Sequence, residues 1–329
     1  MYRQRPRFKF RHFVVPPLAL MFAAIPADAQ PVEVNTCGQT VGKEGGFLSA
    51  DLDCSSFEGA SILLSGRLTL NGHTVTGNAA ASGDARFRAA VRCPEASRCE
   101  IVGPGLLTGG EDGVFVEGKG CLVAGVTVAD NAHAGIDGHT KSRIEVVDSL
   151  ITRNGRIGIS PAKKVRGSSI VFNGAADFLF SAGLATRNGA KVEDTDISDN
   201  FGVGVTSNGS TRSTFKRVTV RRNELDGFSG AGARFKVVES FVEDNGGSGF
   251  LTTDSVKISD TTVSGNVASG VAANQRLIAK RSDVTGNCLL GFPGCFDLLT
   301  CSKPPKVKDV QCEISGNCSG IPWGVCTFD

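Results

Sequence analysis

The sequence predicts an all-β fold, a right-handed parallel β-helix solenoid of about ten coils with disulfide-bearing end caps. Its central part repeats itself, because an asparagine closes a short apolar run about every 22 residues. The runs are short, rich in Val and Ile, and apolar at every second position, which is typical of strands rather than helices. The repeating asparagines are Asn131, Asn154, Asn173, Asn200, Asn223, Asn245, Asn266 and Asn287.

Each repeat has apolar residues at fixed distances from its asparagine, and these positions predict three short strands per coil. Eight residues before it stand Val123, Val146, Val165, Val192, Phe215, Val237, Ile258 and Ala279. Three residues before it stand Val128, Ile151, Ile170, Ile197, Val220, Val242, Val263 and Val284. Five residues after it stand Ile136, Ile159, Phe178, Val205, Phe228, Phe250, Val271 and Phe292. Leucine-rich repeats fit poorly because Leu is sparse at these positions, and left-handed hexapeptide helices have the wrong period.

A glycine follows most of the asparagines by four residues, as at Gly135, Gly158 and Gly204, whereas the copy of Asn173 has Asp177 there. Because Asn and Gly tolerate a left-handed backbone, we expect a fixed bend here between the second and third strands. Stacked coils would place each asparagine over the next at roughly 4.8 Å, so that the amides hydrogen-bond along the rod. The alternative is that these asparagines are ordinary loop residues.

The repeat frame extends in both directions with weaker agreement. Upstream, Gly109 takes the asparagine position and Leu106 stands three residues before it. Downstream, Ile314 and Asn317 suggest a last coil after an insertion. A continuous stack of coils shares one core, so we predict one folded domain. The predicted segments are 1-29 signal peptide, 30-61 N-terminal cap, 62-287 parallel β-helix repeats, and 288-329 Cys-rich C-terminal coil and cap.

The first segment has the features of an export signal. Basic residues precede an apolar stretch from Phe13 to Ile25, and Ala27 and Ala29 form a small-residue cleavage site. No other apolar run approaches ~18 residues, so we expect a secreted or periplasmic chain without a membrane span after processing, with an uncleaved anchor as the alternative. Removing the five basic residues and Asp28 of this segment from the totals of 35 and 33 leaves a net charge of about −2. Nucleic-acid binders are usually strongly basic, so this class of partner is not expected.

The 11 cysteines all follow the predicted cleavage site and fall into two groups that bracket the repeats. In an exported chain they are expected to form disulfides that staple caps over the strand edges; zinc is disfavoured because no His has a suitable spacing. The cysteines expected in disulfides are Cys37, Cys54, Cys93, Cys99, Cys288, Cys295, Cys301, Cys312, Cys318 and Cys326. We predict bonds between Cys37 and Cys54 and between Cys93 and Cys99, which leaves Cys121 as a buried thiol. Cys99 and Cys121 occupy equivalent places in adjacent coils, however, so this pairing stays open.

Basic residues face outward from the first strand of successive coils, and we call them the lateral stripe. They are Lys164, Arg166, Lys191, Lys216, Lys236, Lys257 and Lys280. Regularly spaced cations could bind a long polyanion whose carboxylates repeat. The alternative is a solvated sheet face neutralised by the next position, which is more often acidic, as at Asp194 and Asp260.

A second polar group lies nearer the N-terminus. Two residues after the asparagine position stand Glu111, His133 and Arg156 in successive coils, and Asp137 and His139 follow closely. An acid, a His and an Arg in adjacent layers could abstract a proton next to a carboxylate, so these five are the candidate catalytic residues. The alternative is chance, because turn positions of a β-helix are exposed and usually polar.

Several other chemistries are disfavoured. The only Tyr is Tyr2, which lies in the predicted signal peptide, and no outward carboxylates form an evident facing pair for glycoside hydrolysis. The acidic residues between Glu193 and Asp199 could hold Ca²⁺, but Arg217 and Arg222 suit them equally well as cross-strand partners. We therefore predict no metal or cofactor, with Ca²⁺ at this cluster as the alternative.

Three motifs resemble exported right-handed parallel β-helix repeat proteins of the pectate lyase-like superfamily. They are Cys37-Gly38 with Asp51-Leu52-Asp53-Cys54, then Leu68-Thr69-Leu70-Asn71-Gly72-His73-Thr74-Val75, and Trp323-Gly324-Val325-Cys326. Together with the Asn-x-x-x-Gly repeats, the resemblance covers nearly the whole chain after the predicted cleavage site. It implies the fold and export, and much less an activity, because fold is not function.

The sequence departs from the enzymes of that superfamily at their catalytic motifs. It lacks the Asp-Pro-His motif of alginate epimerases, the Asn-Thr-Asp and Asp-Asp pattern of polygalacturonases, and the pectate lyase calcium signature. No family catalytic residue can be carried over, and His73 is interpreted as part of a structural turn. The leading hypothesis is therefore an exported protein that binds a polysaccharide along the lateral strand face. An acidic polysaccharide is favoured over a neutral one. The alternatives are a lyase or epimerase of a uronate polymer and a non-catalytic envelope scaffold.

Overall fold

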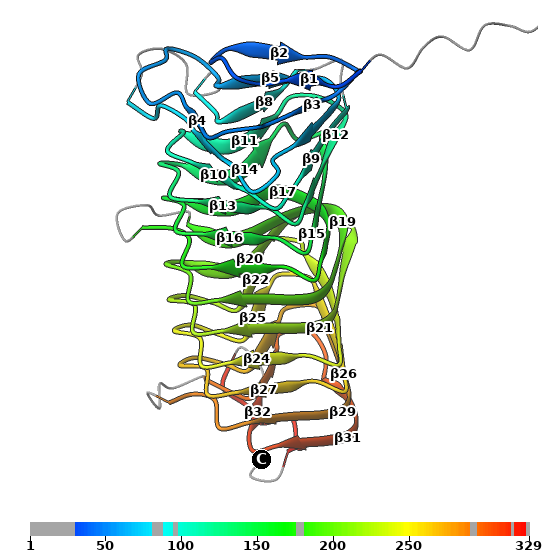
Figure 1. Ribbon diagram of the computed structural model, residues 1–329. Helices are drawn as coiled ribbons and strands as arrows, with labels where there is room; N and C mark the ends of the chain where they lie inside the picture. The colour runs from blue at the N-terminus through cyan, green and yellow to red at the C-terminus, as the bar shows by residue number, and fades with distance from the viewer. Residues whose placement is uncertain are drawn as a thin grey trace, which may run out of the picture.

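The computed structural model describes residues 30–80, 88–94, 98–175, 181–289, 295–316 and 319–326. These residues contain strands and turns but no helix, and successive coils of three strands stack into a rod (Figure 1). Strands of neighbouring coils pair in parallel, so the predicted all-β parallel solenoid of about ten coils is confirmed. Within the described residues, no helix has the length and apolar character needed to cross a bilayer. The predicted signal peptide lies outside them.

Three parallel sheets run along the rod, one for each strand of the coil. The first sheet contains β1 (Val32–Glu33), β3 (Gly46–Phe47), β6 (Arg67–Thr69), β9 (Arg98–Val102), β12 (Gly120–Ala124), β15 (Arg143–Val147), β23 (Arg234–Val238) and β26 (Ser255–Ser259). The second contains β4 (Leu52–Asp53), β7 (Thr74–Thr76), β10 (Leu106–Thr108), β13 (Thr127–Ala129), β16 (Leu150–Thr152), β18 (Ser169–Val171), β24 (Phe241–Glu243) and β27 (Thr262–Ser264).

The third sheet contains β2 (Gln39–Val41), β5 (Ile62–Leu64), β8 (Val91–Cys93), β11 (Asp112–Val116), β14 (Ala134–Gly138), β20 (Val203–Asn208), β22 (Phe228–Gly230), β25 (Phe250–Thr252), β28 (Val271–Ala273), β30 (Leu298–Thr300) and β32 (Ser315–Gly316). Five longer strands turn a corner and belong to more than one sheet. They are β17 (Ile157–Arg166), β19 (Ala182–Ser198), β21 (Arg212–Arg221), β29 (Arg276–Thr285) and β31 (Lys306–Cys312).

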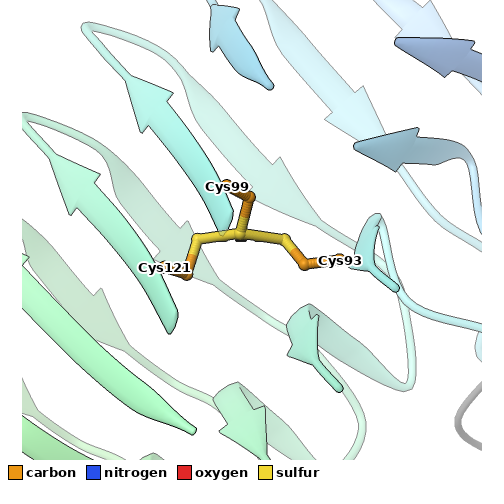
Figure 2. A group of neighbouring side chains, drawn as sticks. All are labelled: Cys93, Cys99 and Cys121. Carbon is orange, nitrogen blue, oxygen red and sulfur yellow. Dashed lines mark hydrogen bonds between the residues drawn. A yellow bond between two sulfur atoms is a disulfide. The ribbon is translucent and has the colours of Figure 1, made fainter. Parts of the chain in front are cut away.

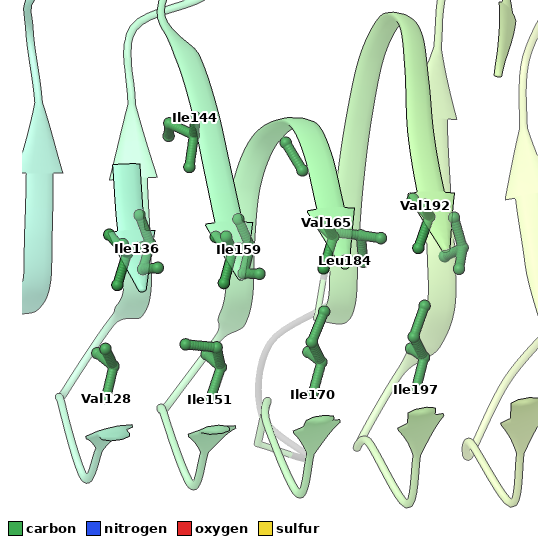
Figure 3. Packing of buried hydrophobic residues seen from close by; sticks show 14 of the residues in the cluster. Val128, Ile136, Ile144, Ile151, Ile159, Val165, Ile170, Leu184, Val192 and Ile197 are labelled. Atoms are coloured by element: carbon green, nitrogen blue, oxygen red, sulfur yellow. The ribbon is translucent and has the colours of Figure 1, made fainter. Parts of the chain in front are cut away.

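The core consists of columns of like side chains, each stacked on its equivalent in the next coil. In one column Val128 pairs with Ile151, which pairs with Ile170, and all three are fully buried (Figure 3). Toward the C-terminus the columns become aromatic, and the rings of Phe228 and Phe250 stack with centroids 4.6 Å apart. Because every coil buries the apolar face of its neighbours, the interior is one continuous core.

The asparagines form a hydrogen-bonded ladder along one corner of the rod, which we call the asparagine ladder. Each Nδ2 donates to the Oδ1 of the next asparagine, as from Asn131 to Asn154 at 2.9 Å and from Asn154 to Asn173 at 2.8 Å. The ladder continues to Asn287, whose Nδ2 donates to Asp297 at 2.9 Å. The predicted stacking is therefore confirmed, and these are not ordinary loop residues.

The left-handed bend lies at a different residue from the one expected. The glycines four residues after the asparagines are not left-handed, whereas the residue before the asparagine is, with φ of 52° at Arg153 and 57° at Asp199. The glycine is needed for a close approach instead. A Cβ added to Gly135 would lie 2.8 Å from Nδ2 of Asn154 and 2.6 Å from Cγ2 of Ile151. The predicted bend between the second and third strands is therefore present, but its left-handed residue precedes the asparagine, and the glycine supplies the space that the ladder requires.

Two frame assignments at the ends of the repeat are also wrong. Leu107, not Leu106, pairs with Val128 and is fully buried, so the asparagine position belongs to the residue after Gly109. The cause is an extra residue in the turn that precedes β10. At the other end, Cys312 pairs with Val284, whereas Ile314 is 41% exposed; Asn317 lies outside the described residues.

Two insertions displace the third strand of their coils. In the copy of Asn173, the residues expected in that strand, Asp177 and Phe178, lie outside the described residues. Their places are taken by Gly183 and by Leu184, which pairs with Ile159. In the copy of Asn287, Leu298 pairs with Val271, while Phe292 lies outside the described residues. Spacing from the asparagine fails here because it holds only while the turn keeps its usual length.

The N-terminal cysteines lie as the sequence predicts, except that one sulfur has two neighbours. The sulfurs of Cys37 and Cys54 are 2.05 Å apart. The sulfur of Cys99 is 2.10 Å from that of Cys93 and 2.25 Å from that of Cys121 (Figure 2). A sulfur forms one disulfide at a time, so this trio holds one disulfide and one buried thiol, and both pairings considered for Cys99 are sterically available.

The C-terminal cysteines form their own bonds. Cys288 lies 2.17 Å from Cys295, and Cys312 lies 2.01 Å from Cys326, sulfur to sulfur. Cys301 is disulfide-bonded as well, and Cys318 lies outside the described residues. The disulfides are thus concentrated at the two ends of the rod, where strand edges would otherwise be open.

Candidate functional site

Three successive coils stack polar residues at the start of the third sheet. Glu111, His133 and Arg156 stand directly before β11, β14 and β17. The amide of His133 donates to the carbonyl of Glu111 at 2.7 Å, and the amide of Arg156 donates to the carbonyl of His133 at 2.7 Å. The backbone of each layer is therefore held by the previous one, which limits how far the side chains can separate.

The imidazole of His133 lies between an acid and a guanidinium. Its Nδ1 is 3.0 Å from Oδ1 of Asp112, and its Nε2 is 3.1 Å from Nη1 of Arg156. A guanidinium only donates, so Nε2 accepts from Arg156 and Nδ1 donates to Asp112. The hydrogen bond to Asp112 raises the pKa of His133, although burial of the ring acts in the opposite direction. In this arrangement Arg156 covers the basic nitrogen of the neutral ring.

Asp137 is the most perturbed acid of the site. Burial, followed by the charge of Asp112, raises the pKa of Asp137 to about 6, against hydrogen bonds from Gly138 and Ser160 that lower it. Polar atoms of Asp112, His133 and Asp137 lie within 4.8 Å of one another. A carboxyl that titrates near neutrality can both accept and donate a proton, which is the property that general acid–base chemistry needs.

Asp137 opens into a cavity of about 1030 Å³ at the corner between the third and first sheets, which we call the corner groove. The groove meets a cavity of about 410 Å³ that extends over the third sheet and includes Arg156; the two share Ser160 and Arg187. It also meets a cavity of about 690 Å³ on the first sheet. The three openings are thus neighbours that share lining residues.

The lining of the corner groove is strongly basic. Its cations are Arg98, Lys119, Lys141, Arg143 and Arg187. Across the part of the chain that the structure describes, none of these side chains makes an ion pair with a carboxylate. Two carboxylates line the groove. Glu117 accepts from Nε and Nη2 of Arg92 at 2.9–3.1 Å, and Asp137 has a raised pKa. The groove therefore presents positive charge that no carboxylate of the described residues neutralises by contact.

The fold and this geometry agree with a family match. The family described as right handed beta helix region matches residues 88–229 and 163–324. The chain belongs to this family. No curated protein matches the sequence. As a member of the right-handed β-helix family, the chain has the handedness that the sequence predicted.

Solved β-helix structures are similar in fold. The periplasmic alginate epimerase AlgG has a TM-score of 0.60 and 15% identity, with 85% of this chain and 76% of that chain covered. A double mutant of AlgG has a TM-score of 0.53 and 15% identity, with 87% and 77% covered. The pectate lyase Pel9A has a TM-score of 0.46 and 15% identity, with 79% and 72% covered. At such identities, the similarity to the two AlgG structures establishes the fold alone.

The β-helix brings together some of the candidate catalytic residues and separates others. His133, Asp137 and Arg156 lie in one cluster, whereas Glu111 lies 3.4 Å from Arg88 in an ion pair. His139 lines the corner groove and contacts the ring of Phe115 edge-on, with centroids 5.8 Å apart. Of the five candidates, Glu111 is thus the one engaged elsewhere.

Sequence reasoning missed Asp112, which is 2% exposed and orients His133. Its carboxylate also accepts the amide of Ala134 at 3.0 Å, so it joins two coils. The signal in the sequence was a carboxylate where the next two coils have the apolar residues Ala134 and Ile157. The position is acidic again at Asp226, whose Oδ1 accepts the amide of Ser248 at 2.8 Å.

The lateral stripe has the register that the sequence predicted. Glu145 pairs with Lys164, which pairs with Lys191, and Lys236 pairs with Lys257 farther along the first sheet. Some of its members are neutralised by neighbouring carboxylates. Lys164 lies 3.7 Å from Glu145, and Lys216 likewise lies 3.7 Å from a carboxylate. The stripe is therefore less available to an anion than the corner groove.

Arginines and aspartates at the corners of the rod pair between coils, and we call these contacts the inter-coil ion pairs. Each arginine binds both carboxylate oxygens of an aspartate one coil earlier, at 2.6–2.8 Å. The pairs are Arg153 with Asp130, Arg217 with Asp194, Arg222 with Asp199, and Arg281 with Asp260. Two of these pairs engage Asp194 and Asp199 of the acidic cluster considered for Ca²⁺, so these two carboxylates already have partners.

The His133 cluster also has the residue types of a metal site, since two carboxylates and an imidazole converge. Arg156 argues against a cation there, because its guanidinium lies 3.1 Å from the imidazole and would repel the metal. A ring that donates from Nδ1 to Asp112 and accepts at Nε2 from Arg156 suits a proton relay better than a metal site. The arrangement can therefore hold and move a proton beside a basic groove.

Proposed function

We propose that the protein is exported and binds an acidic polysaccharide in the corner groove. The observation that carries the proposal is a set of groove cations that have no carboxylate partner among the described residues: Arg98, Lys119, Lys141, Arg143 and Arg187. A uronate polymer offers one carboxylate per sugar, and charge-assisted hydrogen bonds to Arg and Lys are among the stronger polar contacts. The disulfides support export, as does the fold-level similarity to a periplasmic alginate epimerase.

The groove is a better candidate than the lateral stripe for this ligand. Concave sites remove more water from a bound charge than a flat sheet face does, which strengthens each contact. Its cations also have no carboxylate to displace within the described residues, whereas Lys164 and Lys216 would have to leave their partners. We therefore propose that the lateral stripe extends the binding site and that the corner groove is its centre.

Binding is tested with polymannuronate and a neutral glucan at low and raised salt. The groove variant Lys141→Ala, Arg143→Ala, Arg187→Ala should weaken binding of polymannuronate at least about tenfold, which is roughly 1.4 kcal/mol. The matched control, Arg153→Ala, Arg217→Ala, Arg222→Ala, removes the same charge from the inter-coil ion pairs and should leave binding nearly unchanged. Equal losses of affinity in the two variants would mean that only the net charge of the protein matters, which would contradict the proposal. Absence of binding to any polymer would favour the envelope scaffold.

A second candidate function is lyase or epimerase chemistry on the same polymer, favoured by the relay of Asp112, His133, Arg156 and Asp137. Within the described residues, the buried Nε of Arg156 has no hydrogen-bond partner, so the guanidinium still has a donor for a ligand carboxylate. Movement of Arg156 onto that carboxylate would uncover Nε2 of His133. The uncovered nitrogen would take the proton at C5 of the uronate, and the protonated fraction of Asp137 would return one.

The two outcomes of this chemistry leave different products. Return of a proton to the opposite face of C5 gives epimerisation. Its transfer to the departing oxygen at C4 instead breaks the C4–O bond and leaves a C4–C5 double bond, which absorbs in the ultraviolet. Product NMR and absorbance on polymannuronate distinguish them. Turnover by wild type that is lost in both His133→Ala and Asp137→Asn, with binding kept, supports catalysis; wild type without turnover contradicts it and leaves binding untouched.

A further inference from the structure

A second basic cavity lies several coils away, on the first sheet near the C-terminal end. Its volume is about 710 Å³, and we call it the C-terminal pocket. Strands β21, β23, β26 and β29 and the segment 302–306 form its walls. Its cations are Arg212, Arg234, Lys257, Arg276, Lys303 and Lys306.

The charge of the C-terminal pocket is poorly compensated by the protein. Arg234 donates to Asp254 at 2.9 Å, and Asp254 is 6% exposed, so this pair is fixed in the wall. The other five cations make no ion pair with a carboxylate across the residues that the structure describes. Like the corner groove, the pocket thus combines a concavity with cations available to an anion. Only Lys257 among them was singled out from the sequence.

The register places the pocket in line with the corner groove. Arg143 of the groove and Arg212 of the pocket both stand at the start of their first-sheet segments, and Arg276 follows in the same sheet. Strand order runs β15, β17, β19, β21, so Arg143 and Arg212 are three coils apart, or ~14 Å at ~4.8 Å per coil. Arg276 is three coils farther, at ~29 Å from Arg143. Lys164 and Lys191 lie on the face between them.

We propose that the C-terminal pocket is a second subsite for the same polyanion, so that one long chain lies along the first sheet and is held at both ends of that path. The inference rests on the proposed function of the corner groove. Two linked contacts on one chain make the second contact intramolecular, so affinity rises with the length of the polymer. A chain too short to reach both sites gains nothing from the pocket.

The experiment compares dimannuronate, which is shorter than the ~14 Å between Arg143 and Arg212, with long polymannuronate by calorimetry. The pocket variant is Arg212→Gln, Lys257→Gln, Arg276→Gln, and its matched control is Arg153→Gln, Arg222→Gln, Arg281→Gln, which removes three positive charges elsewhere on the surface. The pocket variant should lose roughly tenfold or more in affinity for the long polymer, while its affinity for dimannuronate at the groove stays within about twofold. The control should match wild type for both ligands. Thermal denaturation verifies that each variant is folded.

The outcomes separate this inference from the function on which it rests. Unchanged binding of the long polymer in the pocket variant, with loss in the groove variant, rejects the second subsite and keeps the groove. Equal affinity of wild type for both ligand lengths also rejects it. If the groove variant binds both ligands normally while the pocket variant does not, the proposed function of the groove is wrong, and the two-point arrangement falls with it.

Discussion

The corners of the rod differ in how their polar groups find partners. At the asparagine ladder and the inter-coil ion pairs, each polar side chain is bound by its equivalent in the next coil, as Asn200 is by Asn223 and Arg217 by Asp194. At the corner groove, cations such as Lys141 and Arg143 have no carboxylate partner within the described residues. The repeated corners therefore hold the coils together, whereas the cations of the corner groove are available to a bound ligand.

The pKa shifts follow the same division. Hydrogen bonds from Arg217 hold the pKa of Asp194 below its ordinary value, and those from Arg281 do the same for Asp260. In the groove the opposite occurs, because burial raises the pKa of Asp137 to about 6. Where the repeat supplies a cation, a carboxylate stays ionised; where it does not, the same group becomes a proton carrier.

Breaking the ladder should produce the largest loss of stability. In Asn200→Ala the Nδ2 donor to Asn223 at 2.9 Å and to Ile170 at 3.1 Å is removed, and the acceptor for Asn173 is lost as well. Buried partners left without a bond should cost about 3–5 kcal/mol of unfolding free energy. Urea denaturation measures it. Asn35→Ala, an exposed asparagine outside the ladder, is the control, and equal midpoints for the two variants would contradict the role of the ladder.

A charge reversal in the groove should weaken binding strongly and leave the free energy of unfolding nearly unchanged. Arg143→Glu is expected to weaken polymannuronate binding about a hundredfold, close to 3 kcal/mol, because one attraction becomes a repulsion inside a concavity. The matched variant is Arg153→Glu in the inter-coil ion pairs, with a small effect on binding. Calorimetry at one salt concentration measures the affinities of both variants. Comparable losses of affinity would contradict the different roles assigned to the corner groove and the inter-coil ion pairs.

The ionisation of Asp137 should cost stability as the pH rises. Its folded pKa of about 6 lies above the ordinary value of 3.8, so the folded state binds more protons between these values and the free energy of unfolding falls with increasing pH. Above pH ~6, Asp137→Asn should therefore be more stable than wild type by on the order of 2 kcal/mol, and near pH 4 this advantage should vanish. Denaturation across this pH range tests it; a pH-independent difference would mean that Asp137 is not buried as described.

Removal of a single inter-coil ion pair should have the smallest effect. Arg217→Ala leaves Asp194 exposed to water, which can solvate it, so the melting temperature should fall slightly at low salt and not at all at high salt. The ordinary pKa of Asp194 should return, rising from its depressed value. NMR titration of the Asp194 carboxyl measures this directly, and a pKa that stays depressed would assign the shift to another cause.

The sequence by itself determined the coils, because a repeat of about 22 residues puts the same residue type at the same place in each layer, and like side chains then stack whatever the rest of the molecule does. The asparagine ladder, the buried columns and the register of the lateral stripe are all consequences of that period. The same argument failed where the period changed. At Leu106 one extra residue in the turn shifts the register by one, and in the copy of Asn173 an insertion gives the expected position to Leu184.

Only the tertiary structure decided which polar groups remain without partners. His133 was visible in the sequence, but Asp112, which orients it, belongs to the previous coil and occupies a position that is apolar in the next two coils. The corner groove and the C-terminal pocket likewise depend on turns of unequal length between the third and first sheets. A repeat specifies contacts between equivalent positions of neighbouring coils. Cavities and unpaired charges arise between positions that are not equivalent, and only the folded chain determines which of these positions meet.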